Sequence, residues 1–352
     1  MPITLERIKI KELESFACSL KVGDRARGVV PISKHRARAQ SHNPYADPDD
    51  VALVLANDGK RCVGYMGILP GRLRRGSSIQ KVYWGSTMLV EPAYRGRDIS
   101  GRFLRDGLLR HGIYSTGTSA GMEGAMMSVG FDRFGSVRTL AAGIPGIDLE
   151  RIPVPARAEA RHRRAVEAFS WEEVPEVGPA DFPHPRTANA FHRGYEFVNW
   201  MVHEPWVREG RTTPGKGSGY FFSDTYLVFR YVILRIRDRA SGKPKGFIVL
   251  SLSRPSAETQ TWLKVLDHRF RNPPDRACVL PIAWEYAHAH GATQVRFSGA
   301  LSRYLPESRL ANAPVLESRR PFFCCPRNAR GKLSPDPSTM RLEYTDGDTA
   351  FT

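Results

Sequence analysis

Apolar and polar residues alternate along several short segments of the chain, a pattern typical of strands with one buried face. Thr4–Ile10 alternates in this way, and the apolar run Val51–Ala56 is separated from Cys62–Leu69 by an Asn-Asp-Gly-Lys turn at residues 57–60. An Asp-Gly turn between two apolar runs is a strong hairpin signal. We therefore expect an antiparallel hairpin, followed by a third strand over about Lys81–Val90.

Helical periodicity appears after this third strand. Apolar residues at mainly three- and four-residue spacing predict a helix from Asp98 to about His111, where Gly112 is a natural stop. A strand over 113–118 and a second helix over 119–129 follow, and Gly-Phe comes next in the sequence. Residues before the hairpin, over 11–44, are predicted to form one or two helices.

The second half of the chain repeats part of this order. The pattern predicts strands at 226–237, 246–251 and 261–266, a helix at about 275–290 and a strand at 293–297. Between the halves, residues 146–186 are rich in Pro, Arg and Glu, which indicates a linker with one short helix inside it. The predicted organisation is a domain over 1–145, a linker over 146–186 and a second domain over 187–352.

The loop after the third strand gives this order a family resemblance. Val90, Pro92 and Arg95 match a V-x-P-x-x-R pattern, and the segment resembles motif A of the GNAT superfamily, the acyl-CoA-dependent N-acyltransferases. Asp98 and Ser100 stand where that family prefers glycine. The resemblance implies an α+β fold, with a central, mostly antiparallel sheet flanked by helices. A second, smaller GNAT-like α+β domain, degenerate in its loop, would follow; an unrelated α+β domain is the alternative there.

A strand, a basic glycine-containing loop and a helix start form an anion-binding geometry, because free backbone N–H groups point outward there. By resemblance, the strand binds the pantetheine arm of acyl-CoA and the loop binds its pyrophosphate. The residues assigned to the donor in this way are Met88, Leu89, Val90, Arg95, Gly96, Arg97, Asp98, Ile99, Ser100 and Gly101.

Asp98 is the departure that bears on donor binding. A carboxylate about 6 Å from a phosphate would cost roughly 3 kcal/mol at an effective dielectric constant of about 20. Aspartate is also a good helix N-cap, and Arg95 and Arg97 would offset its charge. Three readings stay open: an N-cap that leaves binding intact, a weakened coenzyme site, and a different acyl donor.

N-acyl transfer needs a base for the amine and an acid for the leaving thiolate. The tyrosine that the family uses as this acid is replaced by Met126, so Tyr114 and Ser119 are the substitute candidates. The base candidate is Glu123, with Glu91 as a second choice. A glutamate in the first turn of a helix also complements the helix dipole, and this structural role is the alternative for Glu123.

The segment before the first hairpin borders the acceptor site in the family. By resemblance, His42, Tyr45 and Asp47 would hold an amine or a sugar, and an ordinary capped loop is the alternative.

Composition narrows the setting. No run approaches the ~18 apolar residues of a membrane span, and the charged start lacks a signal-peptide core, so a cytoplasmic protein is expected. Five cysteines without C-x-x-C spacing argue against a disulfide framework and a zinc site, and no metal is expected.

The net charge of +16 permits a polyanionic partner. Its densest basic cluster, residues 157–164, indicates either a solvated helix or a polyanion-binding patch.

Three functions follow. The first is an N-acyltransferase that uses acetyl-CoA or another acyl-CoA, with direct attack by a primary amine of an amino sugar, amino acid or small amine in a ternary complex. The second is a FemABX-like aminoacyltransferase that uses aminoacyl-tRNA, since that family also pairs two such domains. The third is a catalytically degenerate scaffold. The oligomeric state stays open.

Overall fold

The computed structural model describes residues 2–20, 28–105, 113–116, 120–182, 189–210, 220–222 and 224–324. The first half contains β1 (Thr4–Lys9), α1 (Leu13–Ser19), α2 (Lys34–Ser41), β2 (Val51–Asp58), β3 (Arg61–Arg75), β4 (Ser78–Val90), α3 (Ile99–Phe103), β5 (Ile113–Thr116), α4 (Ala120–Ser128) and β6 (Asp132–Ala142). The predicted hairpin is β2–β3, and Gly59 adopts φ 61° at its turn, a conformation that favours glycine. The order predicted for residues 1–145 is confirmed for the described elements.

The remaining elements are α5 (Ala156–Ala168), β7 (Phe169–Val174), β8 (Asn189–Phe191), α6 (Tyr195–His203), β9 (Arg208–Glu209), β10 (Thr225–Tyr226), β11 (Val228–Asp238), β12 (Pro244–Arg254), β13 (Trp262–Phe270), α7 (Val279–Ala289), β14 (Gln294–Ser298) and β15 (Val315–Cys324). A short 3-10 helix, Pro273–Cys278, leads into α7. Both halves therefore have the element order of a GNAT core.

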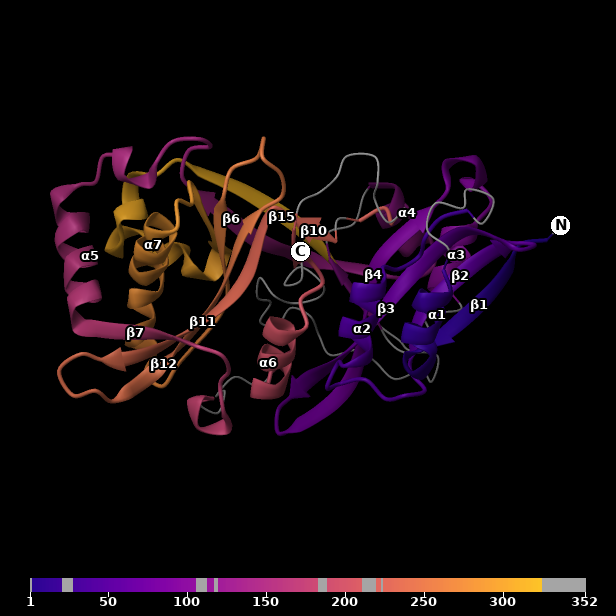
Figure 1. Ribbon diagram of the computed structural model, residues 1–352, viewed down its shortest axis with the longest axis horizontal. Coiled ribbons are helices and arrows are strands. Elements are labelled where there is room, and N and C mark those ends of the chain that lie inside the picture. Colours follow the sequence, from indigo (N-terminus) through magenta and orange to yellow (C-terminus); the bar gives the residue numbers. More distant parts are fainter. Residues whose placement is uncertain are drawn as a thin grey trace.

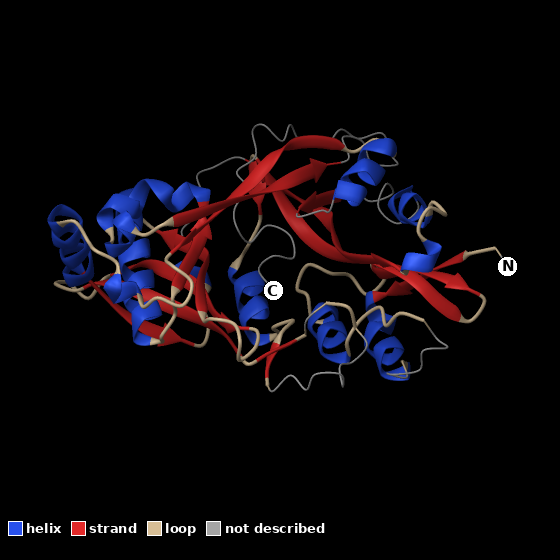
Figure 2. Cartoon of the chain, turned by 90° about the horizontal axis from the view of Figure 1, so that it is seen from above, coloured by secondary structure: helices blue, strands red, loops and turns tan. Residues whose placement is uncertain are grey.

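Among the described residues, thirteen strands form one sheet that runs through both halves (Figures 1 and 2). Its order is β1-β2-β3-β4-β5-β15-β6-β14-β13-β12-β11-β7, with β8 paired to β3. The strand order read inward from β1 is the same as the order read inward from β7. In this comparison, β1 to β6 correspond in turn to β7, β11, β12, β13, β14 and β15. The described pairs of this sheet are antiparallel except β4–β5 and β13–β14, which occupy matching positions.

The two halves exchange their last strands. β15, from the end of the second half, lies between β5 and β6 of the first half, and β6 pairs in turn with β14. Phe322 and Phe323 of β15 are fully buried on opposite faces, in two different apolar clusters. The first half therefore receives part of its core from a strand about 180 residues further along the chain.

Residues 146–186 differ from the predicted linker. They contain α5 and also β7, which pairs with β11 and forms the outer strand of the second half. The prolines that suggested a linker lie on either side of these two elements. β7 is a half-buried edge strand of six residues, so its pattern of apolar and polar residues is too short to stand out in the sequence. The boundaries of the two domains stay predictions.

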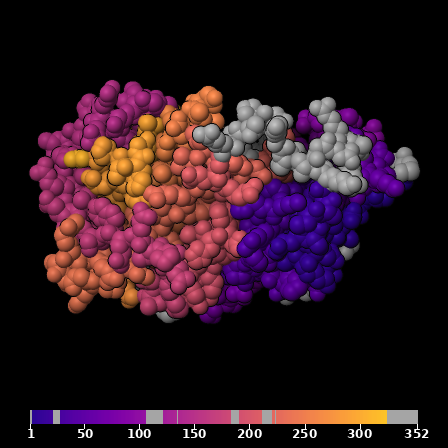
Figure 3. All heavy atoms as spheres, in the orientation of Figure 1, coloured from indigo at the N-terminus to yellow at the C-terminus, as the bar shows by residue number. Residues whose placement is uncertain are grey.

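One apolar cluster joins the halves. It combines Leu69 of β3, Trp84 of β4 and Phe322 of β15 with Phe247 of β12 and Leu266 of β13, and α6 packs on it through Phe197, Trp200 and Met201. In Figure 1, α6 lies between the two ends of the molecule, and Figure 3 shows the surface of this region against the N-terminal residues. The junction is therefore a packed interior, and it is where the candidate site lies.

Candidate active site at the junction of the two halves

β4 and β5 separate after a short parallel contact. Tyr83 pairs with Ile113 and Trp84 with Tyr114, and among the described residues β4 from Gly85 onward pairs only with β3. A register shift opposite Gly67 adds a bulge at this point. The free edge of β4 therefore presents backbone N–H and C=O groups to a ligand.

The three strand residues predicted to bind the donor lie on this free edge. Met88 and Val90 pack against the cluster that contains Phe103 of α3, and Leu89 packs on the opposite face. Their side chains thus support the strand from both faces, and their main chain is left for contact with a ligand.

The loop that follows β4 is exposed and basic. Arg95 donates from Nε to the carbonyl oxygen of Val90 at 3.3 Å, and the guanidinium of Arg97 lies 4.8 Å over the ring of Tyr94. Gly96 has φ 83°. Glu91 precedes the loop and forms an ion pair with Arg61 at 2.5 Å, so this second base candidate is already engaged.

Asp98 occupies the N-cap position of α3, with φ 55°, and its side chain makes no capping hydrogen bond. It forms an ion pair with Arg105 instead. The expected capping bond is therefore absent, and Arg105, rather than Arg95 or Arg97, offsets the charge. A Cβ on Gly101 would lie 2.1 Å from Asp98 Oδ1, so a larger residue there would make this carboxylate move. Of the two residues that follow Asp98, Ile99 is buried and Ser100 is half-buried.

The predicted catalytic residues are only partly described. Glu123 lies in the first turn of α4, with Oε2 3.9 Å from Arg133 Nη1. The main chain of Tyr114 pairs with Trp84, and its side chain lies outside the described part, as does the whole of Ser119. Met126 is buried in the cluster beneath α3 and α4.

The three predicted acceptor residues make different contacts in the structure. His42 pairs through Nδ1 with Glu204 at 2.8 Å, and Asp47 is exposed and pairs with Lys81 at 2.5 Å. Tyr45 is buried and lines a pocket at the junction. The other residues around the pocket are Leu69, Pro70, Gly71, Arg72, Trp84, Phe191, His192, Arg193 and Phe197.

Pairing between β8 and the end of β3 builds this pocket. Leu73 pairs with Phe191, and the backbone N–H of His192 donates to the carbonyl oxygen of Arg72 at 2.8 Å. Tyr45 stacks on Phe197, with ring centroids 5.3 Å apart, and its hydroxyl accepts from the N–H of Gly194 at 2.9 Å. The pocket is therefore held by strand pairing on one side and by α6 on the other.

Two titratable side chains in the pocket are uncharged at neutral pH. Burial raises the pKa of Tyr45 to about 12, so the phenol keeps its proton. Burial, then Arg74 and Arg72, lower the pKa of His192 to about 4. The Nδ1 atom of His192 is 3.4 Å from Arg74 Nη2 and accepts from that cation, which leaves the proton on Nε2.

Behind the pocket lies a buried ion pair that sequence reasoning missed. Arg193 donates from Nε to Asp267 Oδ2 at 2.9 Å, and Arg269 approaches the same oxygen at 3.4 Å. Asp267 lies on β13, where that strand leaves β14. The segment Phe-His-Arg-Gly at 191–194 precedes α6. These polar residues at the start of a helix were the signal in the sequence that could have pointed to Arg193.

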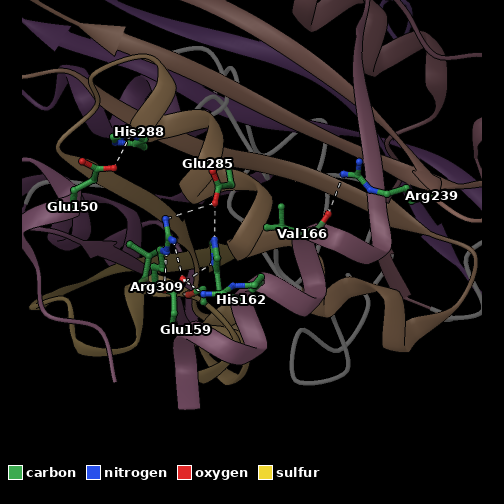
Figure 4. Close-up of polar contacts among 11 residues, drawn as sticks. Glu150, Glu159, His162, Val166, Arg239, Glu285, His288 and Arg309 are labelled. Atoms are coloured by element: carbon green, nitrogen blue, oxygen red, sulfur yellow. Dashed lines mark hydrogen bonds and ion pairs between the residues drawn. The ribbon is translucent and has the colours of Figure 1, made fainter. Parts of the chain in front are cut away.

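A second group of charged residues lies between α5 and α7 (Figure 4). His162 pairs with Glu285 at 2.7 Å, and Arg309 forms two hydrogen bonds with Glu159 at 2.7 and 2.8 Å. Arg161 and Arg163, from the basic cluster of α5, face Glu307 and Glu159. Local carboxylates thus partner half of that cluster, which favours the structural interpretation of the helix.

Comparisons with known proteins agree with the fold. No family model matches the sequence. The mycothiol acetyltransferase of Rhodococcus jostii (strain RHA1) is 25% identical over 188 residues, 49% of this chain and 58% of that protein, so the chain spans less than two thirds of this relative's length. A GCN5-related N-acetyltransferase from Anabaena variabilis has a TM-score of 0.50 at 12% identity, covering 91% of this chain and 72% of that one.

The myristoyl-CoA-bound N-myristoyltransferase of Saccharomyces cerevisiae also has a TM-score of 0.50, at 11% identity, covering 96% of this chain and 82% of that one. With the sheet order and the separation of β4 from β5, these likenesses show that the chain has the fold of these N-acyltransferases. No helix in the described ranges is long and apolar enough to cross a membrane. The described residues also contain no group of three or more His, Cys, Asp or Glu that could hold a metal ion.

Proposed function

We propose that the protein is an N-acyltransferase that moves an acetyl or similar acyl group from acyl-CoA to the primary amine of a small acceptor. The observation that carries this proposal is the position of Trp84. It is the last described residue of β4 that pairs with β5, and its side chain lines the junction pocket. The free edge of β4 and the pocket therefore meet at one residue.

The free edge and its loop fit an acyl-CoA donor. Met88, Leu89 and Val90 offer main-chain partners for an amide-containing arm, and the turn at 95–98, exposed and basic, leads into 99–101 to bind phosphates. The charge of Asp98 is offset by Arg105. In the second half, Pro273 and Pro274 occupy the corresponding loop and remove two N–H donors. We therefore assign the donor to the first half.

The junction pocket would receive the acceptor. It holds about 20 Å³, enough for one small group of a ligand, and it is lined by aromatic rings with polar groups between them. Tyr45, with its proton retained, is a hydrogen-bond donor in this pocket. The guanidiniums of Arg72 and Arg74 disfavour a second positive charge beside them, which would help to keep an acceptor amine deprotonated.

The bound donor would supply an activated thioester, and the chain would orient the amine and move protons. Glu123 stays the predicted base; its carboxylate lies on α4, 3.9 Å from Arg133. Replacing a general base typically lowers the rate by about 10²- to 10⁴-fold. Glu123→Gln should therefore lower kcat by at least about 100-fold, without changing the affinity for acetyl-CoA.

Isothermal titration of the purified protein with acetyl-CoA, together with a free-thiol assay over a panel of amines, tests the proposal. Arg95→Glu should weaken acetyl-CoA binding by about tenfold, because it reverses a charge beside the phosphates. Arg157→Gln, an exposed change in α5, is the control for loss of one positive charge. Absence of acetyl-CoA binding, or equal binding by the Arg95→Glu variant, would contradict the proposal.

A further inference from the structure

Positive charge exceeds negative charge around the junction pocket. Arg72 and Arg74 lie two residues apart on β3 and therefore on the same face of the strand. Among the described residues, neither has a carboxylate partner within ion-pair distance. Arg72 lies over the ring of Tyr45, with 4.6 Å from its Cζ to the ring centroid, and Arg74 reaches His192.

The carboxylates of this region do not balance that charge. Asp267 accepts hydrogen bonds from Arg193, from Arg269 and from the backbone N–H of His268. Glu196, at the exposed start of α6, interacts with Tyr195, and its charge also raises the pKa values of Tyr45 and His192 in the pocket. It brings one negative charge against the two positive charges of the β3 arginines, so an excess of positive charge remains.

Unused hydrogen-bond donors accompany this charge. The Nε atom of Arg74 is buried and has no hydrogen-bond partner among the described residues, and the same holds for Nε of Arg269. With Nδ1 of His192 facing Arg74, its Nε2–H is a further donor. Buried donors without acceptors are costly in a folded protein, and a ligand with acceptor oxygens would remove that cost.

We infer that the acceptor carries an anionic group, a carboxylate or a phosphate, which Arg72 and Arg74 bind beside His192. This inference rests on the proposed function, since it names the class of amine that the junction pocket takes. Guanidinium groups suit both anions because their N–H donors match two oxygens at once. The phenol of Tyr45, between Arg72 and His192, would contact the neutral part of the same ligand.

Matched pairs of amines test the inference. Comparing propylamine with β-alanine tests the effect of a carboxylate on the acceptor. Comparing glucosamine with glucosamine 6-phosphate tests the effect of a phosphate. We expect kcat/KM and the affinity from isothermal titration to favour the anionic member of at least one pair by about tenfold or more, as for a charge-assisted hydrogen bond. Arg74→Gln should reduce this preference to about twofold or less, and Arg74→Lys, which keeps the charge, should retain most of it.

Arg157→Gln is the matched control, because it removes one exposed positive charge from α5, the helix at the far end of the molecule in Figure 1. It should leave the preference unchanged. Equal affinity for both members of each pair, or a preference that survives in Arg74→Gln protein that is as stable as the wild type, would overturn the inference.

The same titrations separate this inference from the proposed function. Acetyl-CoA binding and turnover without preference for anionic amines would sink the inference alone. Binding of the anionic amine without acetyl-CoA binding would sink the proposed function and leave the anion site standing.

Discussion

Arg193 and Asp267 form an ion pair of 2.9 Å in the interior of the protein, with side chains only 6% and 5% exposed. Arg193 precedes α6, which contributes Phe197 to the junction pocket, and Asp267 lies on β13 of the second half. Burial alone would raise the pKa of Asp267, but Arg193, Arg269 and His268 together outweigh it and lower the pKa to about 2. The pair therefore ties the pocket to β13 in the second half.

Removing one member of this pair should destabilise the protein strongly. Asp267→Leu leaves the Arg193 cation buried without its partner, and the free energy of unfolding should fall by about 3–5 kcal/mol. The double variant Arg193→Met with Asp267→Leu should recover much of that loss, since neither member of the pair is left unpaired and Arg269, which also loses Asp267, is partly exposed. Urea denaturation of both single variants and the double variant measures this coupling. Simple addition of the two single losses would contradict it.

Stability should also fall as the pH drops, in two separate windows. The pKa of His192 is about 4 in the folded protein against an ordinary 6.5, so the unfolded chain binds this proton first and stability falls between about pH 6.5 and pH 4. Asp267 stabilises the fold above its ordinary pKa of 3.8, and that contribution is lost as the pH falls toward 2. His192→Gln should flatten the upper window and leave the lower one. An unchanged profile between pH 6.5 and pH 4 would refute the assignment.

Asp98→Gly should strengthen donor binding. It removes the left-handed strain of a non-glycine residue and one negative charge beside the phosphate loop. Because Asp98 is exposed and paired with Arg105, the gain should be modest, about two- to fivefold in the dissociation constant for acetyl-CoA. Titration at low and high salt measures it, and the gain should shrink at high salt. Weaker binding by Asp98→Gly would indicate that the aspartate itself organises the loop.

The exchanged strand should be essential to the first half. Phe322 and Phe323 fill cores on opposite faces of the sheet, and replacing either with alanine should cost about 3–5 kcal/mol. A fragment of residues 1–145 lacks β15 between β5 and β6, and it should not unfold as a cooperative unit. Thermal unfolding of the fragment, compared with the full chain, checks this. Leu316→Ala, at an exposed position of the same strand, is the control and should be nearly neutral. A stable, cooperative fragment would show that β15 is dispensable.

The local elements could be read from the sequence because short-range chemistry decides them. The turn at Gly59, the strands beside it and the loop from Val90 to Asp98 lie where periodicity and turn residues placed them. The same reading suggested Tyr45 for the acceptor, and this residue lines the pocket. It also suggested His42 and Asp47, which stay predictions; their partners Glu204 and Lys81 could not be read from the sequence, because side-chain partners depend on residues distant in sequence.

The sequence by itself determined the alternation of strands and helices in each half and the basic loop after β4. Only the tertiary structure decided that β15 enters the first half, that β8 brings His192 beside Arg72 and Arg74, and that Arg193 pairs with Asp267. Strand pairing and buried ion pairs join residues that are tens to hundreds of positions apart. Their geometry follows from the packing of the whole sheet, and no local pattern contains it.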